Sequence, residues 1–219
     1  MEHLPYLWIL IGYLVGSIPF GLIVGRMNGI DIRQHGSGNI GATNVLRVLG
    51  KPIGYTVLTL DIVKGLLPVL LARIFASDAG AIPNLIPVLT CIATILGHTF
   101  PIWLKFKGGK GISTSAGAIL PLDPITCLIA VALWIGCYFA TRIVSIGSLA
   151  AAISLPTTHT IQRLIDGKWS EQMPVLILMI VIWILATWRH RSNIRGLING
   201  TEHRFEKKKK PTEGEESGA

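Results

Sequence analysis

The sequence predicts an all-α fold, a polytopic membrane bundle of about seven helical spans. Half of the 219 residues are hydrophobic and only 15% are charged, which is too apolar for a soluble domain of this length. The apolar residues gather in long runs, and a run of about 20 residues is what a helix needs to cross a bilayer. Loops rich in glycine and basic residues separate these runs. These observations indicate an integral membrane protein.

Seven apolar segments are candidate spans. In chain order they are Leu4–Val24, Ile53–Ile74, Ile82–Leu96, Ile112–Leu120, Ile125–Ala140, Ile143–Ile161 and Pro174–Trp188. The fourth is too short to cross about 30 Å of hydrocarbon by itself, so it either continues into its flanks or only dips into the membrane. The first has neither a basic start nor a small-residue cleavage pattern, so we interpret it as a retained span and not as a signal peptide.

The distribution of basic residues predicts the orientation of the bundle. If all seven segments cross, one side receives Arg26, Arg33, Arg47, Lys51, Lys105, Lys107, Lys110, Arg142 and the basic segment from Arg189 onward. The other side keeps only Arg73, Arg163 and Lys168. Because basic loops stay in the cytoplasm, we expect the N-terminus outside and the C-terminus in the cytoplasm.

Residues 1–205 form one predicted integral membrane domain, followed by a charged tail at 206–219. The tail lacks the apolar residues that a packed core needs, so we expect it to be disordered. Its lysine run, Lys207–Lys210, is suited to contact anionic headgroups. Three cysteines, Cys91, Cys127 and Cys137, lie in apolar spans without metal-ligand spacing, so we expect packing residues and neither a metal nor a cofactor.

A loop between two apolar segments has the composition of a phosphate site. It reads Gly108-Gly109-Lys110-Gly111 and precedes a predicted helix. Glycines leave backbone N–H groups accessible, the lysine adds a full positive charge, and a helix start adds the positive end of its dipole. The alternative is a flexible basic loop that faces anionic lipid.

The loop after the first span carries a second candidate site. It runs from Gly36 to Arg47 and offers hydrogen bonds from Ser37 and Asn39, while Arg47 offers a bidentate fork for phosphate. The alternative is a glycine-rich turn followed by a helix that Thr43 or Asn44 caps. The two interpretations are compatible, because a capped helix start also binds anions.

Three pairs of polar residues stand at helical spacing in or beside the spans. Asp61 and Lys64 are three apart in the second span, where a structural ion pair is favoured over direct substrate contact. The other pairs are Ser145 with Ser148 and His190 with Asn193. Serines in membrane helices often bond backbone carbonyls, so the first of these is also compatible with a packing role. A basic collar beside the membrane accounts for neither His190 nor Asn193.

Read together, these segments resemble one family, the bacterial glycerol-3-phosphate acyltransferases that use acyl phosphate as donor (the PlsY family). The resemblance rests on Ser37–Asn44 with Arg47, on Phe106–Gly111, on Thr141–Ser145 and on His190–Ile194, in the family's order. Two positions depart from the family pattern: Ser192 replaces a common acidic residue, and Gly196 replaces an expected basic one.

The resemblance implies an activity and a set of site residues. The activity is transfer of a fatty acyl group from acyl phosphate to the 1-hydroxyl of glycerol 3-phosphate, which yields lysophosphatidate and phosphate in phospholipid biosynthesis. The implied catalytic residues are Ser37, Arg47, Lys110, His190 and Asn193. The implied substrate-binding residues are Asn39, Gly108, Gly109, Gly111 and Ser145, with the glycines of Gly108–Gly111 contacting glycerol 3-phosphate through backbone N–H groups.

The resemblance also implies the surroundings of the enzyme. It places the protein in the bacterial cytoplasmic (inner) membrane, with the active site facing the cytoplasm. The expected partners are the two substrates, membrane lipids and the enzyme that forms acyl phosphate, and nucleic acid is not among them.

The residues leave open which group accepts the hydroxyl proton. No histidine is followed five positions later by aspartate, a pair that many glycerolipid acyltransferases use. Acyl phosphate is already activated, so charge stabilisation and positioning can supply most of the rate. We therefore expect His190 to position glycerol 3-phosphate without being an obligatory base.

Two other classes of protein fit the sequence less well. A transporter or flippase for a phosphorylated metabolite needs polar residues that reach the midplane from both sides, with interrupted helices in two matching halves. Here the polar motifs gather on one side. A non-catalytic membrane scaffold leaves Ser37, Asn39, His190 and Asn193 without a role.

Overall fold

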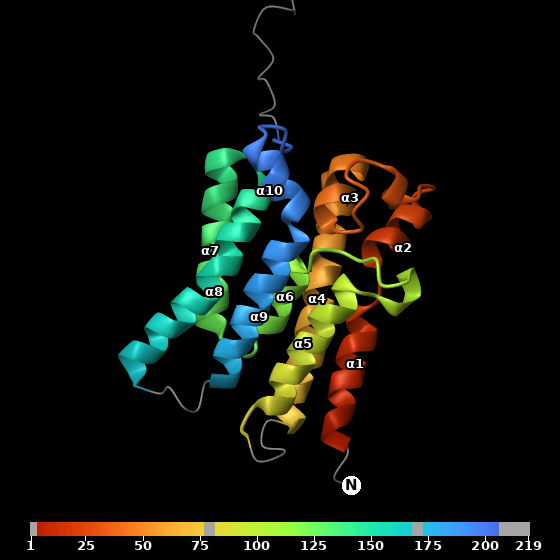
Figure 1. Cartoon of the computed structure of the whole chain (residues 1–219). Helices are drawn as coiled ribbons and strands as arrows, with labels where there is room; N and C mark the ends of the chain where they lie inside the picture. The colour runs from red at the N-terminus through yellow and green to blue at the C-terminus, as the bar shows by residue number, and fades with distance from the viewer. Residues whose placement is uncertain (1–3, 77–81, 168–172, 206–219) are drawn as a thin grey trace, which may run out of the picture.

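The computed structural model describes residues 4–76, 82–167 and 173–205, which form helices joined by loops and contain no strand (Figure 1). The helices are α1 (Leu7–Gly16), α2 (Phe20–Met27), α3 (Ala42–Leu49), α4 (Lys51–Ala76), α5 (Leu85–Thr99), α6 (Ile112–Ile119), α7 (Pro124–Thr141), α8 (Val144–Asp166), α9 (Met173–Arg189) and α10 (Arg191–Ile198). Short 3-10 turns cover Leu4–Tyr6, Ile32–Gln34 and Ile102–Leu104. The all-α prediction is confirmed for these residues, and the predicted disordered tail lies outside them.

The described helices differ in how well they suit a membrane. Three segments are long and apolar enough to cross one: Leu7–Met27, Leu85–Leu104 and Pro124–Thr141. α9 and α10 together make a fourth, bent by 58° at the junction between them. α6 has only eight residues, about 12 Å of helix, so the fourth predicted segment does not cross a bilayer by its own length.

The polar motifs lie at one end of the bundle. Figure 1 shows α3, α10 and the meeting point of α7 and α8 at the upper end, whereas α1, α5 and α9 begin at the lower end. Arg73 and Arg163 stand in the last turns of α4 and α8, at the lower end. Arg73 and Arg163 therefore lie away from the end that carries α3 and the junction of α7 and α8.

The first predicted span is a broken helix. α1 ends at Gly16 and α2 begins at Phe20, because Pro19 has no N–H to continue the hydrogen-bond ladder. The break leaves the carbonyl of Ile18 without a helical donor, and Lys64 Nζ donates to it at 2.8 Å. The same ammonium lies 2.8 Å from Asp61 Oδ1. The predicted ion pair is confirmed, and it binds the break in the first span to the middle of α4.

Glycines allow the central helices to touch through their backbones. Gly65 of α4 lies against the carbonyl of Thr114, and Gly117 of α6 lies against the carbonyl of Ile62. Such contacts without side chains are typical of membrane helices, where close packing drives association. They hold α6 against α4, which positions the loop before α6 at the site end.

We expect Gly117→Ala to destabilise the protein. A Cβ at this position overlaps the backbone of Ile62, so α4 and α6 must separate, at a cost of about 1–3 kcal/mol. The matched control is Gly136→Ala on α7, where a Cβ meets open space. Thermal unfolding in detergent measures both variants, and an equal Tm for the two would contradict this role of Gly117.

Candidate active site

A cavity of about 700 Å³ lies at the site end of the bundle and extends between the helices. Polar side chains line one end, from Ser37, Asn39, Arg47, Lys110, Ser145, His190, Asn193 and Glu202. Apolar residues of α4, α6, α7, α8 and α9 line the rest. Every predicted catalytic residue reaches this cavity, and so do Asn39, Gly111 and Ser145. Gly108 and Gly109 do not line it.

Asn44 shapes the loop that carries Ser37 and Asn39. Its Oδ1 accepts from the backbone N–H of Ser37 at 2.9 Å. Its amide nitrogen donates to three loop carbonyls, those of Ile32, His35 and Asn39, at 2.9–3.2 Å. The predicted cap by Thr43 or Asn44 is wrong: the N-cap residue of α3 is Gly41, without a side-chain cap. Asn44 instead lies buried inside the first turn, where it can replace the missing backbone partners of the loop.

Arg47 faces the cavity from α3 with unused hydrogen-bonding capacity. Its guanidinium carbon lies 5.6 Å from the ring centre of Phe205, which packs over it. Its buried Nε has no hydrogen-bond partner among the described residues. Burial lowers the pKa of the guanidinium and the Glu202 carboxylate opposes this shift, so Arg47 keeps its charge at neutral pH. A charged donor with a free N–H is suited to bind phosphate.

The glycine-rich loop is held from both sides by backbone contacts. The N–H groups of Gly108 and Gly109 donate to the carbonyls of Thr99 and His98, each at 3.1 Å. Arg189 donates to the carbonyls of the same two glycines, at 2.7 and 3.2 Å. The prediction that these two glycines offer free N–H groups to glycerol 3-phosphate is therefore wrong. The reason is tertiary, because the loop docks on the end of α5.

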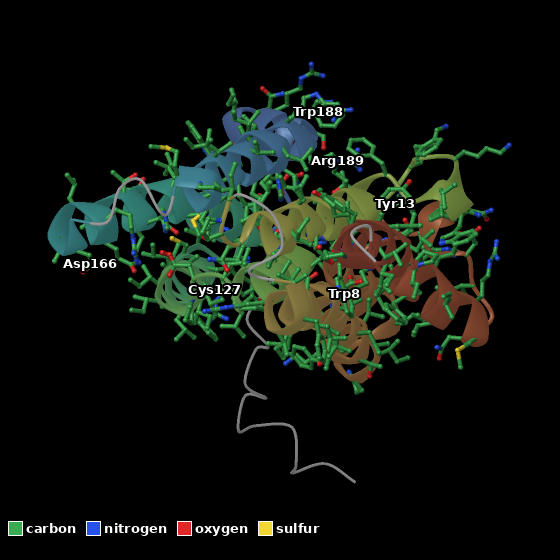
Figure 2. All side chains as sticks on the ribbon, turned by 90° about the horizontal axis from the view of Figure 1, so that it is seen from below. Trp8, Tyr13, Cys127, Asp166, Trp188 and Arg189 are labelled. Carbon is green, nitrogen blue, oxygen red and sulfur yellow. The ribbon has the colours of Figure 1, made fainter. Side chains whose placement is uncertain are left out.

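The glycines are needed for this docking. A Cβ on Gly109 overlaps the ring of His98, and one on Gly108 overlaps the carbonyl of the same residue. Figure 2 shows Arg189 beside Trp188 at one side of the bundle, and its guanidinium carbon lies 5.7 Å from the ring centre of that tryptophan. The arginine is thereby fixed in place over the loop.

The residues that follow these two glycines form part of the cavity wall. Gly111 adopts φ +86° and is the N-cap residue of α6, a conformation that glycine accepts readily. The first N–H groups of a helix have no partners inside it, and here Ile112 and Ser113 of that first turn line the cavity beside Lys110. This helix start and the lysine therefore lie side by side on the cavity wall, in the loop where the sequence predicts a phosphate site.

A chain of hydrogen bonds connects four segments at the polar end. Lys110 Nζ donates to Asn193 Oδ1 at 2.6 Å, and Asn193 Nδ2 donates to Glu202 Oε1 at 2.7 Å. Ser145 Oγ donates to the same carboxylate oxygen at 2.7 Å. Burial lowers the pKa of Lys110, while Glu202 opposes that shift and the cations Arg189 and Arg47 add to it.

Sequence reasoning missed Glu202 as a site residue. It is an acidic residue within the basic segment Arg189–Arg204, and that contrast is the signal which could have drawn attention to it. The chain reverses at Gly200, which adopts φ +69°, so a residue beyond α10 comes back to the cavity. Glu202 thereby brings a carboxylate to the cavity that His190 also lines.

His190 lies at the bend between α9 and α10 and is almost completely buried. Its Nδ1 is 2.8 Å from the carbonyl oxygen of Ala186, and since a carbonyl only accepts, this nitrogen carries the proton. The other ring nitrogen is then a bare acceptor. Burial, then the charge of Lys110, lowers the pKa of His190 to about 4, although Glu202 opposes the shift. The imidazole is therefore neutral at pH 7.

The described residues contain no group of three or more His, Cys, Asp or Glu side chains that could hold a metal ion. The cysteines are free: Cys91 and Cys127 are buried, and Cys137 is partly buried. Cys91 and Cys127 belong to the apolar core, in agreement with the predicted packing role.

The fold and the site together define a class of protein. Cations and a helix start cluster at one end of a cavity whose remaining length is apolar, inside a bundle with helices suited to a membrane. This arrangement fits an integral membrane enzyme that acts on a phosphorylated, lipid-like substrate.

Comparisons with known proteins give the family. The model of the glycerol-3-phosphate acyltransferase family matches residues 6–200. The chain is 43% identical to the glycerol-3-phosphate acyltransferase of Desulforamulus reducens, over 95% of this chain and 100% of that protein. It is 44% identical to that of Geobacter sulfurreducens, over 89% of this chain and 94% of the relative. The chain belongs to the glycerol-3-phosphate acyltransferase family and is an acyltransferase enzyme.

Solved structures agree with this assignment. The crystal structure of PlsY, an integral membrane glycerol 3-phosphate acyltransferase, in its glycerol 3-phosphate form superposes with a TM-score of 0.83 at 37% identity. The alignment covers 92% of this chain and 96% of that one. The lysophosphatidic acid form of PlsY superposes with a TM-score of 0.80. The predicted family resemblance is confirmed, and the protein is an integral membrane protein.

We expect Lys110→Ala and Arg47→Ala to lower kcat/KM at least about tenfold, because a charge-assisted contact contributes about 1.5–3 kcal/mol. The matched controls are Lys107→Ala, an exposed lysine of the same loop, and Arg26→Ala, an exposed arginine of α2. Steady-state acylation of glycerol 3-phosphate measures all four. Loss of activity in the controls as well would show that overall charge, and not these two side chains, binds the substrates.

We expect the pH profile of kcat/KM to have no ascending limb near 6.5, because the pKa of His190 lies at about 4 in the free enzyme. His190→Gln, which keeps a hydrogen-bonding group, should retain a few per cent of kcat with a raised KM for glycerol 3-phosphate. Activity at background, together with a wild-type limb near 6.5 that requires deprotonated His190, would identify the histidine as the base.

The same shift predicts how stability depends on pH. The unfolded state binds more protons at His190 than the folded state between pH 6.5 and about 4, so the free energy of unfolding falls as the pH drops through this window. His190→Gln should weaken that dependence. Unfolding in detergent at a series of pH values measures it, and identical profiles for both proteins would contradict the neutral, buried histidine.

Proposed function

We propose that the enzyme transfers a fatty acyl group from acyl phosphate to the 1-hydroxyl of glycerol 3-phosphate. The observation that carries this proposal is the two-part cavity, in which Arg47, Lys110 and the start of α6 lie at one end and apolar side chains line the rest. Two phosphate groups need such a cationic end, and a fatty acyl chain needs the apolar part. The products are lysophosphatidate and inorganic phosphate.

The position of each side chain supports a division of roles. Arg47 and Ser37 lie on the α3 side and bind the phosphate of the acyl donor. Lys110 and Asn193, on the other side of the cavity, bind the phosphate of glycerol 3-phosphate. Glu202 accepts a hydrogen bond from Ser145 and so fixes the position of that hydroxyl. His190 accepts a hydrogen bond from the glycerol through its unprotonated ring nitrogen. Asn39 and Gly111 complete the walls, while Gly108 and Gly109 act by holding the loop in place.

The reaction needs little acid–base help from the protein. The 1-hydroxyl oxygen attacks the acyl carbonyl carbon, an ester bond forms, and the bond from that carbon to the phosphate oxygen breaks. A phosphate oxygen has a pKa of about 6, above that of the buried His190, so the hydroxyl proton passes to the departing phosphate. Arg47 and Lys110 stabilise the negative charge that develops during this step.

We further propose that the site end of the bundle faces the cytoplasm of a bacterial inner membrane. The described basic residues are concentrated at that end, which is where basic loops remain during insertion. In this orientation the seven predicted segments start outside and finish in the cytoplasm, with α6 as a short segment within the bundle. A contact with the enzyme that forms acyl phosphate belongs to this proposal and rests on the family resemblance.

The apolar chain of the donor has a direct route to the cavity from the bilayer. Leu58 of α4 and Val131 and Ile135 of α7 line the cavity, and these side chains are 36–44% exposed. We propose that the acyl tail enters sideways between these two helices while its phosphate stays at the cationic end. A transporter would instead need polar lining along the whole path, and the apolar depth of this cavity does not favour it.

We expect purified protein in detergent to release phosphate with acyl phosphate and glycerol 3-phosphate, and not to acylate glycerol 3-phosphate with acyl-CoA. The cationic end suits a small phosphate leaving group, and acyl-CoA is the control donor with the same acyl chain. Comparable rates of lysophosphatidate formation from acyl-CoA free of acyl phosphate would overturn the donor assignment.

A further inference from the structure

The deep end of the cavity is formed by the last residue of a stripe on each of four helices. On α8 the lining residues recur at helical spacing from Ser145 to Leu155 and then stop. On α7 the deepest is Cys127, on α6 it is Ile119 and on α9 it is Ile182. The ten helical steps from Ser145 to Leu155 correspond to about 15 Å along α8, so the cavity has a defined depth below the polar end.

This deep end is enclosed, unlike the part nearer the polar residues. The sideways opening lies at Val131 and Ile135, one and two helical turns above Cys127 on α7. Below it, Ile119, Cys127 and Leu155 are all at most 5% exposed. Cys127 Sγ also lies 3.2 Å from the carbonyl oxygen of Ala116, which ties α7 to α6 at this level. Figure 2 shows Cys127 at α7, seen from the end opposite the site.

A buried polar cluster lies immediately beyond the deep end. Asp123 stands four residues before Cys127, and His159 stands four residues after Leu155, so each lies one turn further along its helix. Asp123 Oδ2 is 2.7 Å from His159 Nδ1, and it accepts from Thr126 Oγ1 at 2.8 Å. Gln162 in turn donates to the same hydroxyl at 2.7 Å. None of these four residues lines the cavity.

The hydrogen bonds of this cluster resist any extension of the cavity beyond its deep end. An acyl tail that pushed further would have to break hydrogen bonds between buried groups and leave them without partners in an apolar environment. The methyl end of the tail therefore meets a steric limit at Leu155 and Cys127 and a polar limit behind them.

We infer that Leu155 and Cys127 form the floor that sets which acyl-chain lengths the enzyme uses. This inference rests on the proposed acyl-phosphate donor and assigns residues that decide its chain length. Donors that reach the floor bury their whole tail in the cavity, whereas longer donors have to bend outward through the opening between α4 and α7. A bulkier residue at the floor shortens the preferred chain, and a smaller one lengthens it.

The test compares kcat/KM for lauroyl, palmitoyl and stearoyl phosphate at saturating glycerol 3-phosphate. Leu155→Phe should lower the ratio of palmitoyl to lauroyl activity at least about tenfold, since a misfit of a few methylenes in an apolar pocket has effects of this size. Leu155→Ala should shift the preference in the opposite direction, toward stearoyl phosphate.

Matched controls lie on the same helices but point outward. Ile153→Phe on α8 and Leu128→Phe on α7 change exposed residues that do not line the cavity, so their chain-length ratios should equal the wild-type ratio. If Leu155→Phe fails to fold, Cys127→Leu on the facing helix makes the same prediction. Retained lauroyl turnover shows in each case that the variant is folded.

The outcomes separate this inference from the proposed function. A folded, active Leu155→Phe variant with the wild-type ratio of palmitoyl to lauroyl activity would overturn the role of the floor and leave the donor assignment intact. An equal change of that ratio in Ile153→Phe would have the same consequence. Wild-type protein that uses no acyl phosphate of any length would overturn both. The inference is supported if Leu155→Phe and Leu155→Ala change the preferred chain length in opposite directions while the two control variants keep the wild-type preference.

Discussion

The site depends on one chain of hydrogen bonds, from Lys110 through Asn193 to Glu202 and on to Ser145. These residues come from the loop before α6, from α10, from the segment after α10 and from α8. The Glu202 carboxylate compensates part of the positive charge that Arg47 and Lys110 bring into a half-buried space. Without it, two cations prepared for phosphate would repel each other before any substrate arrived.

Buried polar contacts also position the elements that carry this chain. Lys64 donates to the carbonyl of Ile18 at the break in the first span, which ties this break to α4. Arg189 and the end of α5 hold the glycine-rich loop from two sides. In both places a charged side chain donates to backbone carbonyls inside the bundle. The Lys64 charge is tolerated at this depth because Asp61 pairs with it.

The sequence was informative about which residues matter and less so about how they act. Ser37, Arg47, Lys110, His190 and Asn193 all reach the cavity, because an even number of predicted spans separates their motifs and so returns each motif to the same end of the bundle. The roles of other residues depended on contacts between distant segments. Asn44 organises a loop and caps no helix, and the N–H groups of Gly108 and Gly109 are used by α5. Glu202 belongs to the site because the chain turns back at Gly200 after α10, and the packing of α10 against the bundle decides what that turn faces.

The sequence by itself determined the class of the protein. Its apolar runs can be satisfied only as helices in a membrane, and the order of its polar motifs identifies the family. The tertiary structure decided the depth of the cavity, the neutral state of His190 and the partners of the glycine-rich loop. Each of these depends on which groups lie within hydrogen-bonding or van der Waals distance across separate helices. Hydropathy and spacing report on one helix at a time, so properties that arise between helices became visible only once the helices were packed.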